Sequence, residues 1–419
     1  MCICIYKEKE IYLIKEGVIL LLIIFIEYIY FKGDNMKRII FIIVVMFIIA
    51  TFFIIGNKKD NVNISSNESL EYKAIFFSYI EINKYVKNNN NAKENIDLVI
   101  NNLSNDGFNL ILLHVRSFSD SIYNSNIFPN YLNLDFDVLD YFIKKAHSKN
   151  IDVHAWINPY RISSDKNFII EESHPAYSFL NTTSVKNLDN GVYYNPASLD
   201  VTNLIVSGVE EIVSNYDVDG IIFDDYFYPS KDIDNEEFLL YKDSGGDMNI
   251  SEYRMSNISN MISSVYSCIK QNKKDVLFGI SPQGNISNNY NNEYLDVKKL
   301  LSEEGYIDYI MPQIYFGFNN SSKPFIDTVK EWSSLITNKK IMLIPALSLY
   351  KSGSVDKYAG GGSNEWIDSS DIIKRQIIYS RNIKFYYGFS LFRYDHFYNS
   401  NNPIMKDEVS NIKSILQSS

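Results

Sequence analysis

The stretch VDGIIFDDYFYP, residues 218–229, joins a short apolar run to two adjacent carboxylates. The apolar run at 221–223 is typical of a buried β-strand. Asp224 and Asp225 follow it directly, although two neighbouring carboxylates repel each other and are unfavourable to remove from water. Folding alone gives no reason for this arrangement. The stretch therefore predicts a strand that ends at a functional site.

Seven similar β-rich runs occur along the chain, and longer amphipathic segments separate them. The eight runs are KAIFFSYIEI (73–82), NLILLHVRSF (109–118), DVHAWINPYR (152–161), GIIFDDYFYP (220–229), LFGISPQG (277–284), YIDYIMPQIYF (306–316), KIMLIPALSLY (340–350) and YYGFSLFRY (386–394). The helices expected between them are 93–105, 135–149, 198–216, 252–272, 324–337 and 369–382. Strands separated by helices require crossovers and a parallel sheet, so eight such units predict an α/β fold, a (β/α)8 TIM barrel. A doubly wound open sheet is the alternative, but no glycine-rich phosphate turn follows the first run.

A membrane anchor is expected before the barrel. Residues 39–55 are apolar apart from one Thr, follow Lys37 and Arg38, and are not followed by a small-residue cleavage site. The segment 36–56 is therefore predicted to be an uncleaved signal anchor, just long enough to span a membrane. This predicts a single-pass protein of the cell membrane with its catalytic domain outside the cytoplasm.

The remaining divisions of the chain follow from this anchor. Residues 1–35 contain a second apolar stretch, and because MKRII at 36–40 resembles the start of a signal sequence, we interpret them as an over-extended start. If both apolar stretches spanned the membrane, the rest of the chain would return to the cytoplasm. Residues 57–72 are interpreted as a linker, 73–400 as the barrel and 401–419 as a C-terminal helix that completes it.

The composition excludes several partners and cofactors. The 419-residue chain has a formal net charge of -10 and no basic patch dense enough to follow a phosphate backbone, so no nucleic-acid partner is expected. Cys2 and Cys4 lie at the extreme N-terminus and Cys268 stands alone, so the barrel has no disulfide or thiolate metal site. The five His residues form no His-x-x-x-His or His-Glu-x-x-His pair. No metal or other cofactor is expected.

Polar and aromatic residues gather at the carboxyl ends of the predicted strands, where TIM barrels hold their active sites. Beside the catalytic candidates Asp224 and Asp225, the residues expected to contact a substrate are Arg116, His154, Trp156, Asn158, Arg161, Asn195, Tyr226, Tyr228, Ser281, Gln313 and Tyr315. Each has a structural alternative. A strand-end Asn or Gln often caps a loop, and His154 is equally consistent with a core histidine. Trp156 is also consistent with packing at the barrel mouth, and Arg116 is also consistent with a structural counter-ion for Asp225.

Four of these motifs carry a family resemblance. HAWINPYR (154–161), YYNPASLDVTNLIVSGVEEIVSNYDVDGIIFDDYFYP (193–229), FGISPQG (278–284) and YIDYIMPQIY (306–315) resemble, in this order, the motif series of the bacterial glycosyl-hydrolase-like family 10. The resemblance runs from about residue 73 to 398. The sequence departs from the family pattern in two places. The first run lacks Arg-Gly-x-Trp, and the second run reads HVRSFSDSIY where Gln-Val-Arg-Pro is typical.

The resemblance implies a TIM-barrel glycosidase that acts on a cell-wall polysaccharide, peptidoglycan glycan strands stripped of their stem peptides. Glycosidic cleavage needs a proton donor and a group that stabilises the oxocarbenium ion. Successive strand residues point to opposite faces, so one of the two acids should face the barrel mouth, and we assign Asp224 as general acid. Asp225 would orient it or hold Arg116 and His154.

The second catalytic group is left open by the sequence. No Glu ends the seventh or eighth run, so the 2-acetamido group of an N-acetylated sugar could act as nucleophile, helped by the acid pair and Tyr315. One alternative is a barrel that binds wall glycan without cleaving it. Another is a metal-dependent polysaccharide deacetylase, suggested by Phe223-Asp224-Asp225 but lacking the His-x-x-x-His metal site.

Overall fold

The computed structural model describes residues 71–87 and 90–416, which all belong to one compact unit, 69–419. The expected over-extended start, the signal anchor and nearly all of the linker lie outside the described residues. Among the helices of the described ranges, none is both long and apolar enough to cross a membrane.

A parallel sheet of nine strands forms the centre of the fold. Its strands are β1 (Tyr72–Phe77), β2 (Leu110–Arg116), β3 (Asp152–Ile157), β7 (Gly220–Phe223), β8 (Leu277–Ile280), β9 (Tyr309–Ile310), β10 (Met342–Leu343), β11 (Ala346–Ser348) and β12 (Gly388–Phe392). Their order is β10-β9-β8-β7-β3-β2-β1-β12-β11, and every pairing is parallel. Each of the eight predicted runs supplies a strand, and the seventh supplies both β10 and β11.

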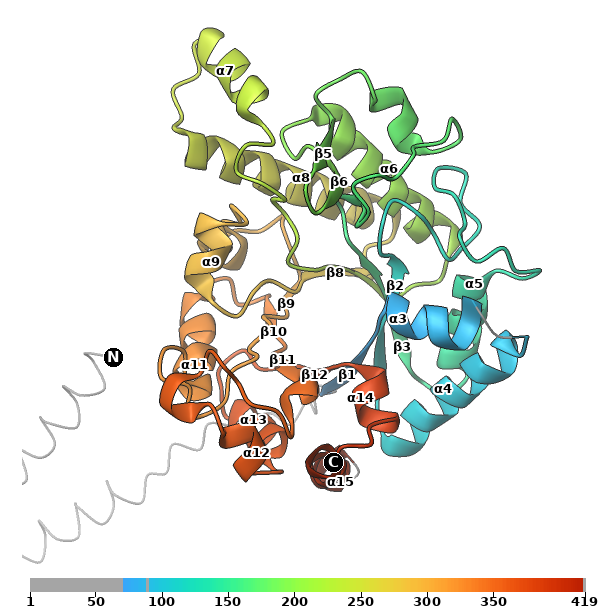
Figure 1. Cartoon of the computed structure of the whole chain (residues 1–419), viewed down its shortest axis with the longest axis vertical. Coiled ribbons are helices and arrows are strands. Elements are labelled where there is room, and N and C mark those ends of the chain that lie inside the picture. The colour runs from blue at the N-terminus through green and yellow to red at the C-terminus, as the bar shows by residue number, and fades with distance from the viewer. Residues whose placement is uncertain (1–70, 88–89, 417–419) are drawn as a thin grey trace, which may run out of the picture. The chain divides into compact units, whose positions relative to one another are not determined.

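The two ends of this sheet meet. β10 and β11 are consecutive pieces of one run, 340–350, yet they stand at opposite ends of the strand order. Ala346 of β11 also bridges to Gln313, which follows β9, and Leu343 of β10 bridges to Tyr386, which precedes β12. The sheet therefore curls around into a TIM-barrel-like ring, and Figure 1 shows the strands around the centre with the helices outside them.

The six predicted helices are present in the described residues, within a few residues of the expected bounds. They are α4 (Ala92–Asp106), α5 (Val138–His147), α6 (Leu199–Asn215), α8 (Ile250–Asn272), α11 (Phe325–Leu335) and α13 (Ile372–Ser380). The last described helix is α15 (Pro403–Leu416), and the shorter ones are α3 (Tyr79–Ile82), α7 (Asn235–Asp243), α9 (Ile286–Asn291), α10 (Val297–Ser302), α12 (Glu365–Asp368) and α14 (Tyr394–Tyr398). The helix α6 shows why the pattern predicts them. Ser198 caps its first turn by accepting from the Val201 N–H, and the buried face repeats every three or four residues from Val201 to Ile212.

Two apolar layers hold the barrel together. The larger lies between the sheet and the helices, and the smaller fills the barrel interior. The interior residues are Ala74, Phe76, Leu110, Leu112, Trp156, Ile222, Tyr309, Met311, Ile344 and Ala346. Because strand residues alternate between faces, these residues also determine which side chains beyond each strand face the barrel mouth.

The connection 162–197 contains a small second sheet. It is antiparallel, in the order β4-β6-β5, with β4 (Arg161–Ser163), β5 (Val185–Leu188) and β6 (Gly191–Tyr194). Leu188 pairs with Gly191, so Asp189 and Asn190 form a two-residue hairpin turn. Gly191 has a φ of 141°, and an added Cβ there would lie 2.1 Å from the Ser163 carbonyl oxygen.

Candidate active site

Asp224 follows β7 and faces the barrel interior, two residues after the interior residue Ile222. It is only 4% exposed. The Trp156 indole Nε1 donates to its Oδ2 at 3.1 Å, and the Asn158 amide Nδ2 donates to the same oxygen at 3.3 Å. Burial, followed by the charge of Asp225, raises the pKa of Asp224 to about 7. Near neutral pH the carboxyl therefore holds a proton that it can donate.

Asp225 is more open and acts as the ionised partner. Burial raises the pKa of Asp225, whereas a hydrogen bond with Gln313 and the charge of Arg161 lower it. Its own charge in turn raises the pKa of Asp224. The charge of Asp225 therefore favours retention of the proton on Asp224.

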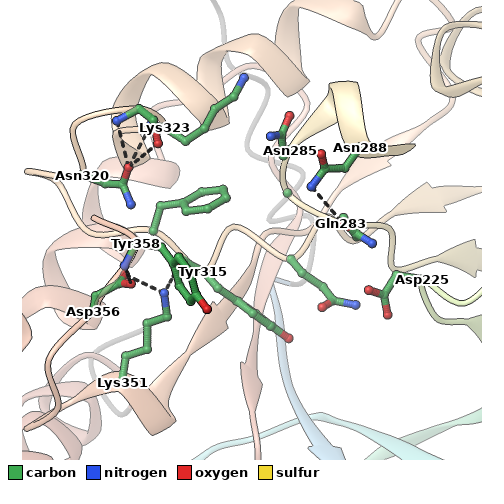
Figure 2. A pocket seen from close by; sticks show the side chains of 14 residues that line it. Asp225, Gln283, Asn285, Asn288, Tyr315, Asn320, Lys323, Lys351, Asp356 and Tyr358 are labelled. Atoms are coloured by element: carbon green, nitrogen blue, oxygen red, sulfur yellow. Dashed lines mark hydrogen bonds and ion pairs between the residues drawn. The ribbon is translucent and has the colours of Figure 1, made fainter. Parts of the chain in front are cut away.

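Two cavities meet at Asp225. One has a volume of about 260 Å³ and the other about 360 Å³, and both are lined by Asp225, Gln313 and Tyr315. The smaller is also lined by Phe76, Ser78, Tyr79, Ile80, His114, Trp156, Arg161, Asp224, Tyr226 and Phe392. The larger is also lined by Gln283, Gly284, Asn285, Asn288, Phe316, Asn320, Ser322, Lys323, Lys351, Asp356 and Tyr358. Together they form one cleft that extends to both sides of the acid pair, and Figure 2 shows Asp225 across the larger cavity from Lys351 and Asp356.

Stacked rings hold the indole that contacts Asp224. The His114 and Trp156 rings are 3.6 Å apart and nearly parallel, and Phe76 meets Trp156 edge-on at 5.2 Å. Burial holds the pKa of His114 well below its ordinary value, so His114 is neutral. These contacts keep the Trp156 N–H directed at Asp224.

Arg161 supplies the positive charge of the site. Its guanidinium lies over the Tyr226 ring at 4.4 Å, and its backbone N–H donates to the Asn158 Oδ1 at 3.2 Å. It lowers the pKa of both Asp224 and Asp225. Tyr226 is half exposed and forms an aromatic surface at the cleft.

Arg116 lies elsewhere, which corrects the expectation that it faces Asp225 or a substrate. The register of β2 shifts between His114 and Arg116, so the alternation of faces breaks there. The guanidinium of Arg116 lies 3.9 Å from the Phe128 ring, and a Cβ added at Gly208 of α6 would lie 2.1 Å from its NH1. The side chain therefore points out of the barrel into the helix layer.

His154 lies inside the barrel but at its opposite end, so it neither contacts Asp225 nor lines the cleft. It pairs in register with Gly220, four residues before Asp224, and its Nδ1 hydrogen-bonds the Tyr309 hydroxyl at 2.8 Å. A Cβ at Gly220 would lie 2.6 Å from its ring, so glycine makes room for it. Burial lowers the pKa of His154 to about 4. The structure therefore favours the core-histidine alternative.

Three further predicted contacts line neither cavity of the cleft, and two of them have structural partners. Asn195 Nδ2 donates to the Thr183 carbonyl at 3.0 Å, and its Oδ1 accepts from the Ala197 N–H at 3.0 Å. The Tyr228 hydroxyl donates to Asp234 Oδ2 at 2.6 Å. Ser281 is 1% exposed. Asn195 therefore caps a loop, which is the alternative stated for such an Asn, and Tyr228 holds a loop in place.

Sequence reasoning missed several residues around the acid pair. Tyr79, at the end of the first predicted run, and Lys351 and Asp356, which follow the seventh, line the cleft but are absent from the expected contacts. Glu293 is a partly buried carboxyl whose pKa is raised by this burial and, in addition, by the charge of Asp225. It lies between α9 and α10, far from any predicted strand end, and no motif marks it. In the described part of the chain, no three His, Cys, Asp or Glu side chains are grouped as a metal site would need.

Comparisons with known proteins identify the family of the chain. The sequence model of the glycosyl hydrolase-like 10 family matches residues 61–360. The chain is 30% identical over 312 residues to the glycosyl hydrolase YngK of Bacillus subtilis, covering 67% of this chain and 59% of YngK. It is 28% identical over 351 residues to the glycosyl hydrolase DigH of Escherichia coli K12, covering 75% of this chain and 78% of DigH.

Solved structures share the fold at low sequence identity. The PgaB (BpsB) glycoside hydrolase domain from Bordetella bronchiseptica has a TM-score of 0.58 at 12% identity, covering 83% of this chain and 99% of that domain. An endo-1,4-beta-mannanase from Rhizomucor miehei has a TM-score of 0.52 at 11% identity, covering 84% of this chain and 96% of that one. These likenesses show the fold, whereas the match over 61–360 shows the family. The chain belongs to the glycosyl hydrolase-like 10 family.

Proposed function

We propose that the protein is a glycoside hydrolase that cleaves N-acetylated cell-wall glycan, peptidoglycan strands without stem peptides, with Asp224 as general acid. One observation carries the proposal. A buried carboxyl whose pKa is raised to about 7 faces an open cleft, beside a second carboxyl whose charge adds to that shift. Membership of the family and the names of YngK and DigH support the hydrolase class.

Asp224 would protonate the oxygen of the leaving sugar. In the transition state the carboxyl becomes negative, and Trp156 Nε1 and Asn158 Nδ2 already point at its Oδ2. Hydrogen bonds to a charged group are stronger than those to a neutral one, so both donors stabilise the transition state more than the ground state.

Asp225 and Tyr315 would act on the other side of the scissile bond. Both line both cavities of the cleft, so they lie where two sugar units would meet. An ionised Asp225 can orient a 2-acetamido group and stabilise the positive charge that develops when this group attacks. This scheme needs an N-acetylated sugar and no second carboxylate nucleophile.

The shape and lining of the cleft suit a polymer. Cavities on both sides of the acid pair can hold sugar units on both sides of the cleaved bond. Tyr226 provides a half-exposed ring for stacking, and amides such as Asn285 and Asn288 provide hydrogen-bonding groups for hydroxyl and acetamido substituents. A wall substrate also requires the barrel to lie outside the cytoplasm, as the predicted anchor at 36–56 would place it.

Product analysis tests this proposal. The protein is incubated with peptidoglycan glycan strands, before and after an amidase has removed the peptides, and the products are analysed by mass spectrometry. Shorter glycans are expected only from the denuded strands and only without the Asp224→Asn substitution. Strands that stay intact but co-sediment equally with both proteins would instead support a glycan-binding barrel. An acetyl group lost from an uncut strand would support a deacetylase.

A further inference from the structure

Glu293 connects the two loops that border the acid pair. Its Oε2 accepts from the backbone N–H groups of Phe227 at 3.1 Å and Tyr228 at 3.3 Å. These two residues follow Asp225 in the chain by two and three positions. Its Oε1 accepts from the Gln283 side-chain amide at 3.1 Å. One partly buried carboxyl therefore joins the loop after β7 to the loop after β8.

These bonds also set the orientation of a side chain in the cleft. Gln283 lines the larger cavity, and its Oε1 accepts from Asn288 Nδ2 at 3.2 Å, the bond drawn in Figure 2. Because Glu293 can only accept while ionised, it turns the NH₂ of Gln283 toward itself and the carbonyl toward Asn288. The side-chain amides of Gln283 and Asn288, which both line the larger cavity, therefore depend on Glu293 for their orientation.

The charge of Glu293 is tied to the acid pair. Burial raises the pKa of Glu293 to about 7, the Tyr228 and Phe227 N–H groups oppose this, and the charge of Asp225 adds to it. Asp225 in turn faces a set of titratable and charged groups besides Glu293, namely Asp224, Arg161, Tyr226 and Tyr315. The coupling is reciprocal, so each ionised carboxyl disfavours the ionisation of the other.

We propose that Glu293 is a positioning residue, which anchors the loop that carries Asp224 and Asp225 and orients Gln283 without touching the substrate. It lines neither cavity of the cleft, so its effect passes through these neighbours. The inference rests on the proposed function for its kinetic test, but its geometry holds whatever the cleft binds.

Two variants of the full-length protein separate anchoring from charge. Glu293→Gln keeps a carbonyl oxygen for the two backbone N–H groups and so keeps the anchor, which kcat reports. Its NH₂ makes the amides of Gln283 and Asn288 turn over, so the groups that they present to the cleft are exchanged and KM should rise. Glu293→Ala removes the anchor. We expect kcat on denuded glycan strands to fall by about tenfold or more in Glu293→Ala and to recover to within about threefold in Glu293→Gln.

Glu408 provides the matched control. It is fully buried and accepts from the backbone N–H groups of Ile372 at 2.8 Å and Lys374 at 3.2 Å, and burial raises its pKa to about 7. It lies in α15 and lines neither cavity of the cleft. Glu408→Ala should lower the melting temperature but leave kcat unchanged, when all variants are assayed well below their melting temperatures.

A second readout does not depend on hydrolysis. In protein labelled with ¹³C at the Glu side-chain carboxyls, the Glu293 resonance is identified by its loss in Glu293→Gln. Its titration midpoint should move to lower pH by roughly half a unit or more in Asp225→Asn, because the neighbouring negative charge is gone. The Glu408 midpoint should not move.

The outcomes are distinguishable from failure of the proposed function. The positioning role would be overturned by a wild-type kcat in folded Glu293→Ala, or by a kcat that does not recover in Glu293→Gln, even if the enzyme cleaves glycan. A titration midpoint of Glu293 that does not move in Asp225→Asn would also overturn it. If the wild-type protein cleaves no glycan while the midpoint moves as expected, the hydrolase proposal fails and the link between Glu293 and Asp225 stands.

Discussion

The substitution Trp156→Phe tests how the protein sets the acidity of Asp224. Phenylalanine keeps an aromatic ring to stack against His114 and Phe76 but removes the Nε1–H donor, which lies 3.1 Å from the Asp224 carboxylate. This donor lowers the pKa of Asp224, because it stabilises the ionised form. Its loss should therefore raise the pKa of Asp224 above the present value of about 7.

The geometry sets the size of this effect. Hydrogen bonds to charged groups contribute about 1.5–3 kcal/mol, and the separation of 3.1 Å is at the long end of the usual range. The lower figure, about 1.5 kcal/mol, corresponds to roughly one pH unit. The alkaline limb of the pH profile of kcat/KM should therefore move from about pH 7 to roughly pH 8. The same loss in the transition state should lower the maximal kcat by up to about tenfold.

The assay is the pH dependence of kcat/KM on denuded glycan strands. Trp366→Phe is the control, because Trp366 is also buried but its Nε1 has no hydrogen-bond partner and it lines neither cavity of the cleft. An alkaline limb that stays in place in Trp156→Phe, or that moves equally in Trp366→Phe, would refute the reasoning.

Three further predictions concern stability and binding. Asp224 keeps its proton in the folded protein up to about pH 7 but loses it near pH 4 in the unfolded chain, so the stability of the fold falls as the pH rises through this window. Asp224→Asn should therefore raise the melting temperature at pH 8 by about 2 °C or more. Calorimetry that shows no gain would contradict this. Arg254 forms a nearly fully buried ion pair with Asp234 at 2.7 Å. Arg254→Met should therefore lower the free energy of unfolding by about 3–5 kcal/mol in urea titrations. A loss below about 1 kcal/mol would show that the pair is dispensable. Tyr226→Ala should raise KM for glycan strands several-fold, whereas Tyr226→Phe should leave KM unchanged, because the face of the ring is the proposed contact. Equal effects of the two substitutions on KM would point to the hydroxyl instead.

The barrel could be predicted because its signals are local and repeated. Each of the eight apolar runs became a strand, and alternation from Ile222 placed Asp224 in the barrel mouth. The same alternation misplaced Arg116, because one irregularity in β2 after His114 turned it outward. His154 shows a different limit. It does face the interior, but depth within the barrel depends on register with Gly220, which a single strand cannot reveal.

The parts of the site that escaped prediction come from loops. Glu293 follows a six-residue helix and bonds to the backbone of Phe227 and Tyr228 only because two loops fold together, so its spacing in the sequence carries no sign of those contacts. Asn195 and Tyr228 belong to the motifs that marked the site, yet they stabilise the loops around it. A motif in this chain therefore identifies the region of the site, and the side-chain contacts decide which residues of the motif line the cleft.

The most direct test of the central claim is the cleavage of denuded glycan strands by wild-type protein and by Asp224→Asn, followed by mass spectrometry. The substituted amide cannot donate the proton, but it can keep the position of the carboxyl between Trp156 and Asn158. We predict that the wild-type protein releases short glycans and that Asp224→Asn binds the strands but releases roughly a hundredfold less product or none. Equal product from both proteins would contradict the account.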